Sequence, residues 1–244
     1  MNWKKDLREK DDAVSPVIAL MLILAILATC MAVYTTTYVP GLKQQDEITH
    51  TGEVKLAFMR FASDIDNVIA LGKPAVYTEV LELGGGDVPL SPTKSSGTIE
   101  INPSPIGTYQ VDGGETKDLN GIAVTYTPSF TAWEKQGYLY KNGVVWITKD
   151  EKKTPAQLTL YTVSDGEYRE KDVLQTWYPE SAVIIPNFHV VEKKSAITGT
   201  STAKLRLNAT LDETDTPNVK IILSDGTIQH YSAVRWLNIE VSVE

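Results

Sequence analysis

The residue types that catalyse reactions or bind metals are few in this sequence and widely spaced. The histidines, His50, His189 and His230, form no His-Glu-x-x-His zinc motif, and the single cysteine, Cys30, is near none of them. One thiol can form neither an intramolecular disulfide nor a multi-thiolate metal site. His189 and His230 fall in strand-like segments that could approach each other, although polar strand residues are the simpler interpretation. The sequence therefore predicts no metal site and no catalytic residue.

Motifs for cofactor binding and hydrolysis are also missing. There is no Gly-x-Ser-x-Gly nucleophile elbow and no Asp-x-Asp-x-Asp-Gly calcium loop. Gly84-Gly85-Gly86 and the Ser/Pro/Thr-rich segment 89–97 predict a mobile loop, because no helix start with Lys followed by Ser or Thr comes after them. We therefore expect no cofactor and no enzymatic activity; a membrane-tethered extracellular hydrolase would lack any supporting motif.

The composition and net charge of the chain argue against a nucleic-acid partner. The chain has 244 residues, 42% of them apolar and 22% charged, which is ordinary for one or two globular units and argues against general disorder. Its 23 basic and 31 acidic residues give a net charge of −8. An acidic chain lacks the basic surface of nucleic-acid-binding proteins, so no nucleic-acid partner is expected.

The most distinctive segment is apolar and lies near the N-terminus. Residues 13–39 include no charged residue. As a helix they extend about 40 Å at about 1.5 Å per residue, enough to cross a hydrocarbon core of about 30 Å. Basic residues are more frequent before it (Lys4, Lys5, Arg8 and Lys10) than shortly after it (Lys43 and Lys55). This bias predicts a cytoplasmic N-terminus and an external remainder.

Two other interpretations of the apolar segment are weaker. A cleavable secretory signal needs a shorter apolar run and a small-x-small site, and no Ala-x-Ala occurs here. Leu27-Ala28-Thr29-Cys30 imitates a lipoprotein signal, but Thr29 is a poor residue before the cysteine and the next four residues stay apolar. We expect Cys30 to be one more apolar helix residue.

The start of this segment resembles a known processing region. Lys10-Asp11-Asp12-Ala13, followed by a Val-Ser-Pro-Val-Ile run, is similar to the class III signal peptides of archaeal type IV pilin-like proteins. Ser15 can cap a first helical turn and Pro16 is tolerated inside one, so a helix is predicted to begin there. The residues of this helix-start motif are Val14, Ser15, Pro16, Val17 and Ile18.

The resemblance implies processing and assembly. A prepilin peptidase would cut between Asp12 and Ala13, remove the cytoplasmic leader 1–12, and leave segment 13–39 as a membrane anchor and later a filament-core helix. Asp12 stands where the family more often has a basic residue, and no acidic residue follows early in the apolar helix, as it does in bacterial pilins. The implied partners are membrane lipid, the peptidase, and copies of this chain or other pilins. An uncleaved signal anchor is the alternative.

Residues 40–74 predict a juxtamembrane amphipathic helix. Pro40-Gly41 interrupts the apolar run, as either a kink or a break. Apolar residues then recur every three or four positions, and Gly72-Lys73-Pro74 supplies a stop. The residues of this stripe are Phe58, Phe61, Ala62, Ile65, Val68 and Ile69. We expect the stripe to pack on the chain's own outer domain; packing on neighbouring subunits is the alternative.

Residues 75–244 predict an extracellular β-sandwich-like domain, so the fold class is α+β with a long N-terminal hydrophobic helix. Asn142-Gly143 and Asp225-Gly226 are hairpin turns, and 212–218 is an exposed loop. The predicted strands are Val76–Leu83, Thr98–Ile101, Gly121–Tyr126, Tyr138–Tyr140, Val144–Thr148, Gln157–Val163, Ala182–Ile185, Lys204–Ala209, Val219–Leu223, Thr227–Ser232 and Arg235–Val243.

Two sequence features of this domain concern its surface and its aromatic residues. Asn208-Ala209-Thr210 is a candidate N-glycosylation acceptor. Aromatic residues are frequent, and we interpret them as core or cross-strand pairs in preference to adhesive contacts. They are Trp133, Tyr138, Tyr140, Trp146, Tyr161, Trp177, Tyr178 and Trp236.

These observations lead to two functional hypotheses. The first is a structural pilin-like subunit of an archaeal cell-surface filament, with the β-domain exposed for surface contacts or adhesion. The second is an uncleaved, membrane-tethered β-domain that binds an external partner in a stator-like or receptor-like role.

Overall fold

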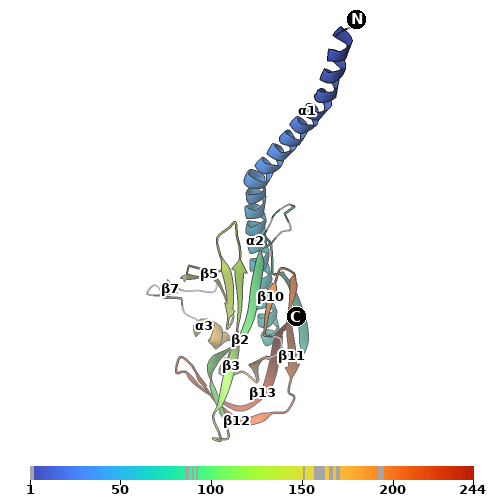
Figure 1. The fold of residues 1–244 in the computed structure, drawn as a ribbon. Coiled ribbons are helices and arrows are strands. Elements are labelled where there is room, and N and C mark those ends of the chain that lie inside the picture. Colours follow the sequence, from blue (N-terminus) through green and yellow to red (C-terminus); the bar gives the residue numbers. More distant parts are fainter. Residues whose placement is uncertain are drawn as a thin grey trace.

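The computed structural model describes residues 3–244, except 86–87, 90, 92, 151, 157–162, 165–166, 169–170 and 192–194. At 3–15 and in the described parts of 163–172 it describes the backbone alone. The molecule is elongated: a helical rod, residues 3–71, enters a mainly-β head, residues 75–244 (Figure 1). The α+β class and the mainly-β domain are as the sequence predicts.

The rod is one uninterrupted helix with a local change of pitch. It consists of α1 (Trp3–Val33), a π-helical turn at Tyr34–Tyr38, and α2 (Val39–Leu71). Pro40 has no N–H to donate, and just before it the N–H of Val39 bonds to the carbonyl of Tyr34, five residues back. The rod changes direction at this point (Figure 1). Of the two alternatives at Pro40-Gly41, the structure shows the kink.

The start of α1 differs from the sequence prediction. The helix begins at Trp3, so Pro16 lies inside it and Ser15 does not cap its first turn. The segment before Pro16 includes three lysines and single Leu, Arg and Glu residues, which favour helix. Loss of the one hydrogen bond that Pro16 cannot make therefore does not end the helix.

The end of α2 is as predicted. Gly72 adopts a left-handed conformation, with φ of 57°, and its N–H bonds to the carbonyl of Val68 at 2.9 Å. Few residues other than glycine take this conformation without strain, which is why the stop falls here.

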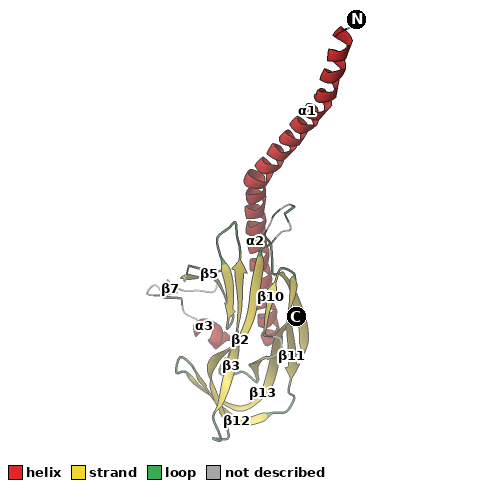
Figure 2. Cartoon of the chain, viewed as in Figure 1, coloured by secondary structure: helices red, strands yellow, loops and turns green. Residues whose placement is uncertain are grey.

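The head is built on one extensively paired sheet (Figure 2). Its strand order is β1-β11-β13-β12-β2-β3-β4-β5-β6, with β10 beside β2 and β9 beside β13. All pairs are antiparallel except β9 with β13, and β7 and β8 form a separate hairpin. The elements are β1 (Ala75–Glu82), β2 (Ser96–Val111), β3 (Lys117–Ser129), β4 (Gly137–Lys141), β5 (Val144–Lys149), β6 (Lys152–Pro155), β7 (Val163–Ser164), β8 (Glu167–Tyr168), α3 (Lys171–Trp177), β9 (Ile184–Val190), β10 (Ala196–Gly199), β11 (Thr202–Leu211), β12 (Thr216–Leu223) and β13 (Ile228–Val243).

Strand β13 joins the two halves of the sheet. Residues 228–234 pair with β12, whereas residues from Arg235 onward pair with β9 on one side and, from Leu237, with β11 on the other. The two strands predicted here, Thr227–Ser232 and Arg235–Val243, are therefore one strand that changes partners after Val234. Strand β9, which pairs with β13, also lies against β3, so residues from both halves of the sheet contribute to the core.

Strand β2 is longer than predicted because it passes through two prolines. The prediction ended at Ile101, but pairing with β3 continues through Pro103 and Pro105 and shifts register before Gly107. Gly107 allows β12 to approach closely, since a Cβ there would lie 2.2 Å from the carbonyl oxygen of Ile222. Elements β6, β10 and α3 were not predicted, and most of the predicted strand Gln157–Val163 lies outside the described residues.

The apolar stripe of α2 packs on the chain's own head, as predicted. Phe58, Phe61, Ile65 and Val68 are each at most 1% exposed. The Phe61 ring meets the ring of Tyr140 edge-on at 5.3 Å. Most of the aromatic residues noted in the sequence are core residues: Tyr138, Tyr140, Trp146, Trp177 and Tyr178 are buried, Trp133 and Trp236 are half-buried, and Tyr161 lies outside the described residues.

Both predicted hairpin turns form. Asn142 and Gly143 have φ of 46° and 92°, the paired positive values of a tight turn between β4 and β5. Between β12 and β13, Gly226 has φ of 84°. The 212–218 loop is shorter than predicted, because Thr216 already begins β12.

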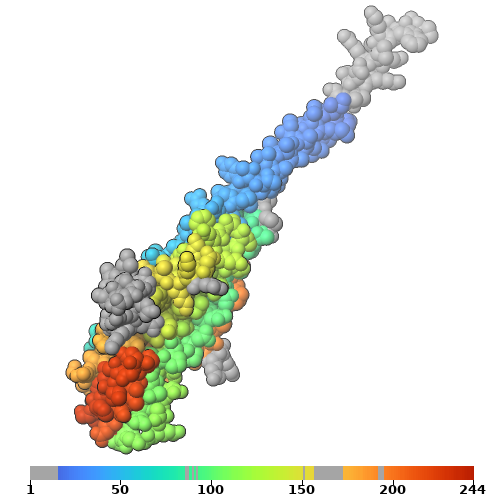
Figure 3. Space-filling view, turned by 90° about the vertical axis from the view of Figure 1, so that its left-hand side faces the viewer, coloured from blue at the N-terminus to red at the C-terminus, as the bar shows by residue number. Residues whose placement is uncertain are grey.

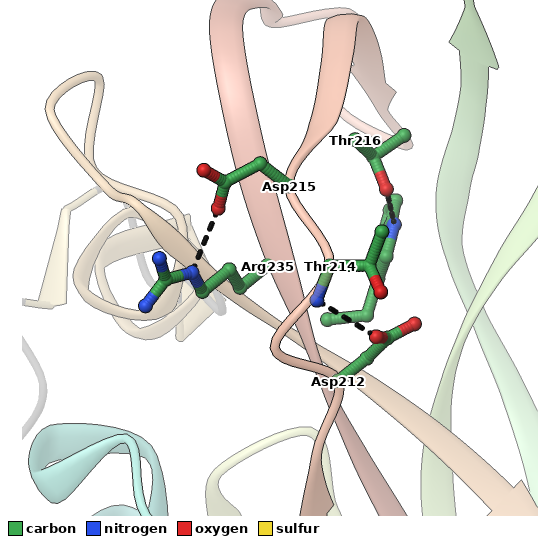
Figure 4. Close-up of polar contacts among 6 residues, drawn as sticks. Asp212, Thr214, Asp215, Thr216 and Arg235 are labelled. Carbon is green, nitrogen blue, oxygen red and sulfur yellow. Dashed lines mark hydrogen bonds and ion pairs between the residues drawn. The ribbon is translucent and has the colours of Figure 1, made fainter.

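The short loop at 212–215 is fixed by side-chain hydrogen bonds, one within the loop and one to β13 (Figure 4). The N–H of Thr214 bonds to Asp212 Oδ1 at 2.9 Å, and Arg235 Nε donates to Asp215 Oδ1 at 2.7 Å. These contacts join the loop to the point where β13 changes partners.

Candidate functional site

Among the described residues, most of the exposed large apolar side chains belong to the rod. Within the described residues, the helix Pro16–Leu71 is long and apolar enough to cross a membrane, and none of its most apolar stretch is buried. Figure 3 shows this part of the rod projecting beyond the head. The exposed large side chains from 17 to 33 are Val17, Ile18, Leu20, Met21, Leu22, Ile23, Leu24, Ile26, Leu27, Met31 and Val33. Burial of such a surface against lipid or other apolar groups is favourable.

The hydroxyl groups on this part of the rod bond to the rod itself. Thr29 and Thr36 donate to the carbonyls of Ala25 and Ala32, four residues earlier, and Thr35 donates to that of Met31 at 3.0 Å. A threonine satisfied in this way places no unpaired donor in apolar surroundings. Cys30 is exposed on the same surface. The rod surface is therefore compatible with a water-free environment.

A pair of tyrosines marks the end of the apolar stretch. The rings of Tyr34 and Tyr38 are stacked, with centroids 6.1 Å apart, and Tyr38 is 64% exposed. Tyrosine is typical of the boundary between hydrocarbon and water, where its ring is covered and its hydroxyl is hydrated.

Below this point three polar side chains fasten the rod to the head. Lys43, Glu47 and His50 follow one another at helical spacing on α2 and are 5%, 0% and 3% exposed. Lys43 Nζ donates to the carbonyl and hydroxyl oxygens of Thr93, each at 2.7 Å. We call Lys43, Glu47 and His50 the polar seam.

Glu47 is the central member of the polar seam. Its Oε1 accepts from the hydroxyl of Ser95 and, at 3.0 Å, from the N–H of Thr131, while its Oε2 accepts from the N–H of Ala132 at 2.9 Å. Burial would raise the pKa of this carboxyl, but the hydrogen bonds outweigh burial and the pKa is lowered. Glu47 is therefore an ionised clamp between α2 and the loop that follows β3.

His50 is a neutral member with a defined tautomer. Its Nε2 lies 2.9 Å from the hydroxyl of Tyr126, which itself donates to the carbonyl of Leu83 at 3.0 Å. Because the tyrosine proton is directed to Leu83, Nε2 must carry the imidazole proton and Nδ1 has the lone pair. Burial lowers the pKa of His50, although Glu53, Glu82, Asp46 and Glu47 oppose this shift.

Sequence reasoning missed the polar seam, although a signal was present. Residues 43, 47 and 50 continue the three- and four-residue spacing of the buried positions Val54, Phe58 and Phe61. Because the earlier members are polar, a search for apolar periodicity stops at Val54.

The residues predicted from sequence do not come together in one place. Asp12, Ala13, Val14 and Ser15 are helical, and Pro16 follows them inside α1. His189 pairs with Glu240 in β13, whereas His230, ten positions earlier in that strand, pairs with Lys220. The structure thus separates the two histidines that were considered as neighbours.

The candidate glycosylation acceptor is part of the sheet. Asn208 is half-buried in β11 and pairs with Val76 on one side and Glu240 on the other. It shares the outer face of β11 with the exposed residues Arg206 and Thr210, so an attached glycan would project away from the core.

Comparison of the chain with protein-family models, with curated proteins and with solved structures gives no match. The functional conclusion therefore depends on the geometry of the rod and the head.

Proposed function

We propose that this chain is a structural pilin-like subunit of an archaeal cell-surface type IV filament. The observation that supports the proposal is the continuity of the rod. One end of the helix exposes an apolar surface with self-satisfied hydroxyls, and the other end is built into the core of the head. A subunit that is first anchored in the membrane and later packed in a filament needs both an exposed apolar helix end and a helix end fixed in its own head.

During assembly the exposed apolar part of α1 would leave lipid and pack against identical helices of neighbouring subunits. Lipid tails and neighbouring helices are equally apolar, so the net gain must come from close side-chain packing. Before this step a prepilin peptidase would cut between Asp12 and Ala13. In this proposal the N-terminus would lie in the cytoplasm and the head outside the cell, an orientation that the Lys/Arg bias supports. Tyr34 and Tyr38 would then lie at the outer boundary of the membrane.

The head would then cover the filament surface and make lateral or adhesive contacts. The polar seam and the apolar stripe of α2 hold it against the rod on successive turns of one helix face. Contacts made by the head are thereby transmitted to the helical core.

One observation favours the second candidate, an uncleaved membrane-tethered domain that binds an external partner in a stator-like or receptor-like role. The helix passes through the expected cleavage region without a break from Trp3 onward. In that case the leader and the anchor would form one functional helix.

The intact mass of the protein isolated from native cells tests the proposal. A mass that lacks residues 1–12 supports the filament subunit, and a full-length mass favours the tether. Ala13→Trp should block both processing and incorporation into filaments, whereas Ala13→Ser keeps a small residue and should be processed. Normal incorporation of Ala13→Trp, seen by electron microscopy of sheared surface material, would contradict the proposal.

A further inference from the structure

A cluster of one imidazole and two carboxylates lies beside the polar seam. His50 and Glu53 lie three residues apart on α2, and Glu82 is the last residue of β1. One ring nitrogen of His50 and one carboxylate oxygen from each glutamate lie within 4.8 Å of one another. The three residues line a cavity of about 320 Å³, so solvent and ions have room at this point.

The imidazole has an unused acceptor. His50 is 3% exposed, and its Nδ1 has no hydrogen-bond partner within the part of the chain that the structure describes. A buried polar atom without a partner is unfavourable and unusual. The other ring nitrogen donates to Tyr126, which is the arrangement of a metal-bound histidine: an outer partner fixes the tautomer and directs the free lone pair at the ion.

Within the described residues the two carboxylates also have no ion-pair partner. Across the described ranges the side chains of Glu53 and Glu82 form no hydrogen bond or ion pair, and Oδ2 of Asp46, one turn before His50, is buried and unpaired. Arg60 lines the same cavity, but its Nε pairs with Glu79 Oε2 at 3.3 Å. Four carboxylates, those of Asp46, Glu47, Glu53 and Glu82, therefore act electrostatically on the His50 ring.

We propose that His50, Glu53 and Glu82 bind a divalent transition-metal ion of the Zn²⁺ type, with water completing the coordination. An imidazole nitrogen with two carboxylates suits zinc, whereas Ca²⁺ and Mg²⁺ prefer oxygen ligands alone. Metal–ligand distances of about 2.0–2.2 Å require the two exposed glutamate side chains to close around the ion. The bound ion joins α2 to β1 and so fastens the rod to the head. The site stands on this geometry and does not depend on the filament function.

The test is zinc titration of the full chain in detergent micelles, after removal of metals with a chelator. Isothermal titration with ZnCl₂ should show one ion per chain. Glu53→Gln and Glu82→Gln keep the size of the side chain and should each weaken zinc binding at least tenfold, because each removes an ionised ligand. Glu100→Gln, which removes an exposed carboxylate from β2, is the matched control and should bind as the wild type does.

The outcomes are distinct. The absence of zinc binding, or zinc binding that neither Glu53→Gln nor Glu82→Gln weakens, overturns the site. Equal binding of CaCl₂ overturns the choice of a transition metal. His50 is not substituted, because it also holds Tyr126 and its loss would disturb the fold. As a second readout, zinc should raise the melting temperature of the wild type and of Glu100→Gln, but not that of Glu82→Gln.

Discussion

The Oε2 atom of Glu47 accepts a hydrogen bond of 2.9 Å from the backbone N–H of Ala132. A fully buried carboxylate on the helical rod is thereby held by main-chain donors from a loop more than eighty residues later in the chain. Ionised acceptors of this kind form stronger hydrogen bonds than neutral ones. The attachment of the rod therefore depends on a charge as well as on apolar packing.

Glu47→Gln should destabilise the head by about 2–3 kcal/mol, because the amide replaces one charged acceptor with a donor that faces N–H groups. Urea unfolding of the full chain in detergent, followed by tryptophan fluorescence, measures the change. Glu115→Gln, in the exposed turn between β2 and β3, is the control and should be nearly neutral. Equal stabilities of the two variants would show that the clamp contributes nothing.

The same residue predicts a dependence on pH. The pKa of Glu47 in the folded protein is below its ordinary value of 4.5, so its contribution is present above that value and is lost as the pH falls through the folded pKa. Melting temperatures measured between pH 3 and 7 should therefore converge for the wild type and Glu47→Gln at the acid end. Burial raises the pKa of Asp64, Asp66 and Glu79, so these groups change the stability with pH in the opposite direction to Glu47. They do so in both proteins, and their effect cancels when the two melting temperatures are subtracted.

Phe61→Ala should cost about 3–5 kcal/mol, because it leaves a cavity where α2 meets the ring of Tyr140. Leu56→Ala changes the same helix on its exposed side, where Leu56 is 61% exposed, and should alter the free energy of unfolding by less than about 0.5 kcal/mol. Urea unfolding again gives both values. Similar losses would mean that the stripe does not form the contact described.

Pro40→Ala should straighten the rod, because an N–H at position 40 can donate to the carbonyl of Thr36 and restore regular α-helix in place of the π-helical turn. Spin labels at Cys30 and at an introduced Leu56→Cys span the turn, and their distance should lengthen in double electron–electron resonance. Gly41→Ala is the control: its Cβ would meet no atom within 4 Å, so the distance should stay unchanged. An unchanged distance in Pro40→Ala would exclude the proline as the cause of the bend.

The sequence predicted elements that are governed by local pattern. The spacing of Phe58, Phe61 and Ile65 placed the buried face of α2, and Asn142-Gly143 placed a hairpin, because each signal lies within a few residues. The alternation of Leu205 and Leu207 likewise located β11.

Features decided by distant partners were missed. The pattern around Val234 suggested the end of one strand and the start of another, but pairing with β9 and β11 carries β13 through it. The predicted strand ended at Ile101, yet β2 continues through Pro103 and Pro105, with a register shift against β3 before Gly107. The roles of Glu47 and His50 depend on loops that no local pattern connects to the helix.

Helix α2, which belongs to both the rod and the head, also fixes the rotation of the head about the rod axis. Since α2 enters the head without a joint, the direction in which the head faces around the rod axis is set by the number of residues between the bend at Tyr34–Tyr38 and Lys43. Inserting one residue there would turn the head by about 100° and lift it by about 1.5 Å. The number of residues between the bend and Lys43 therefore sets both the distance of the head along the rod and the direction in which the head faces.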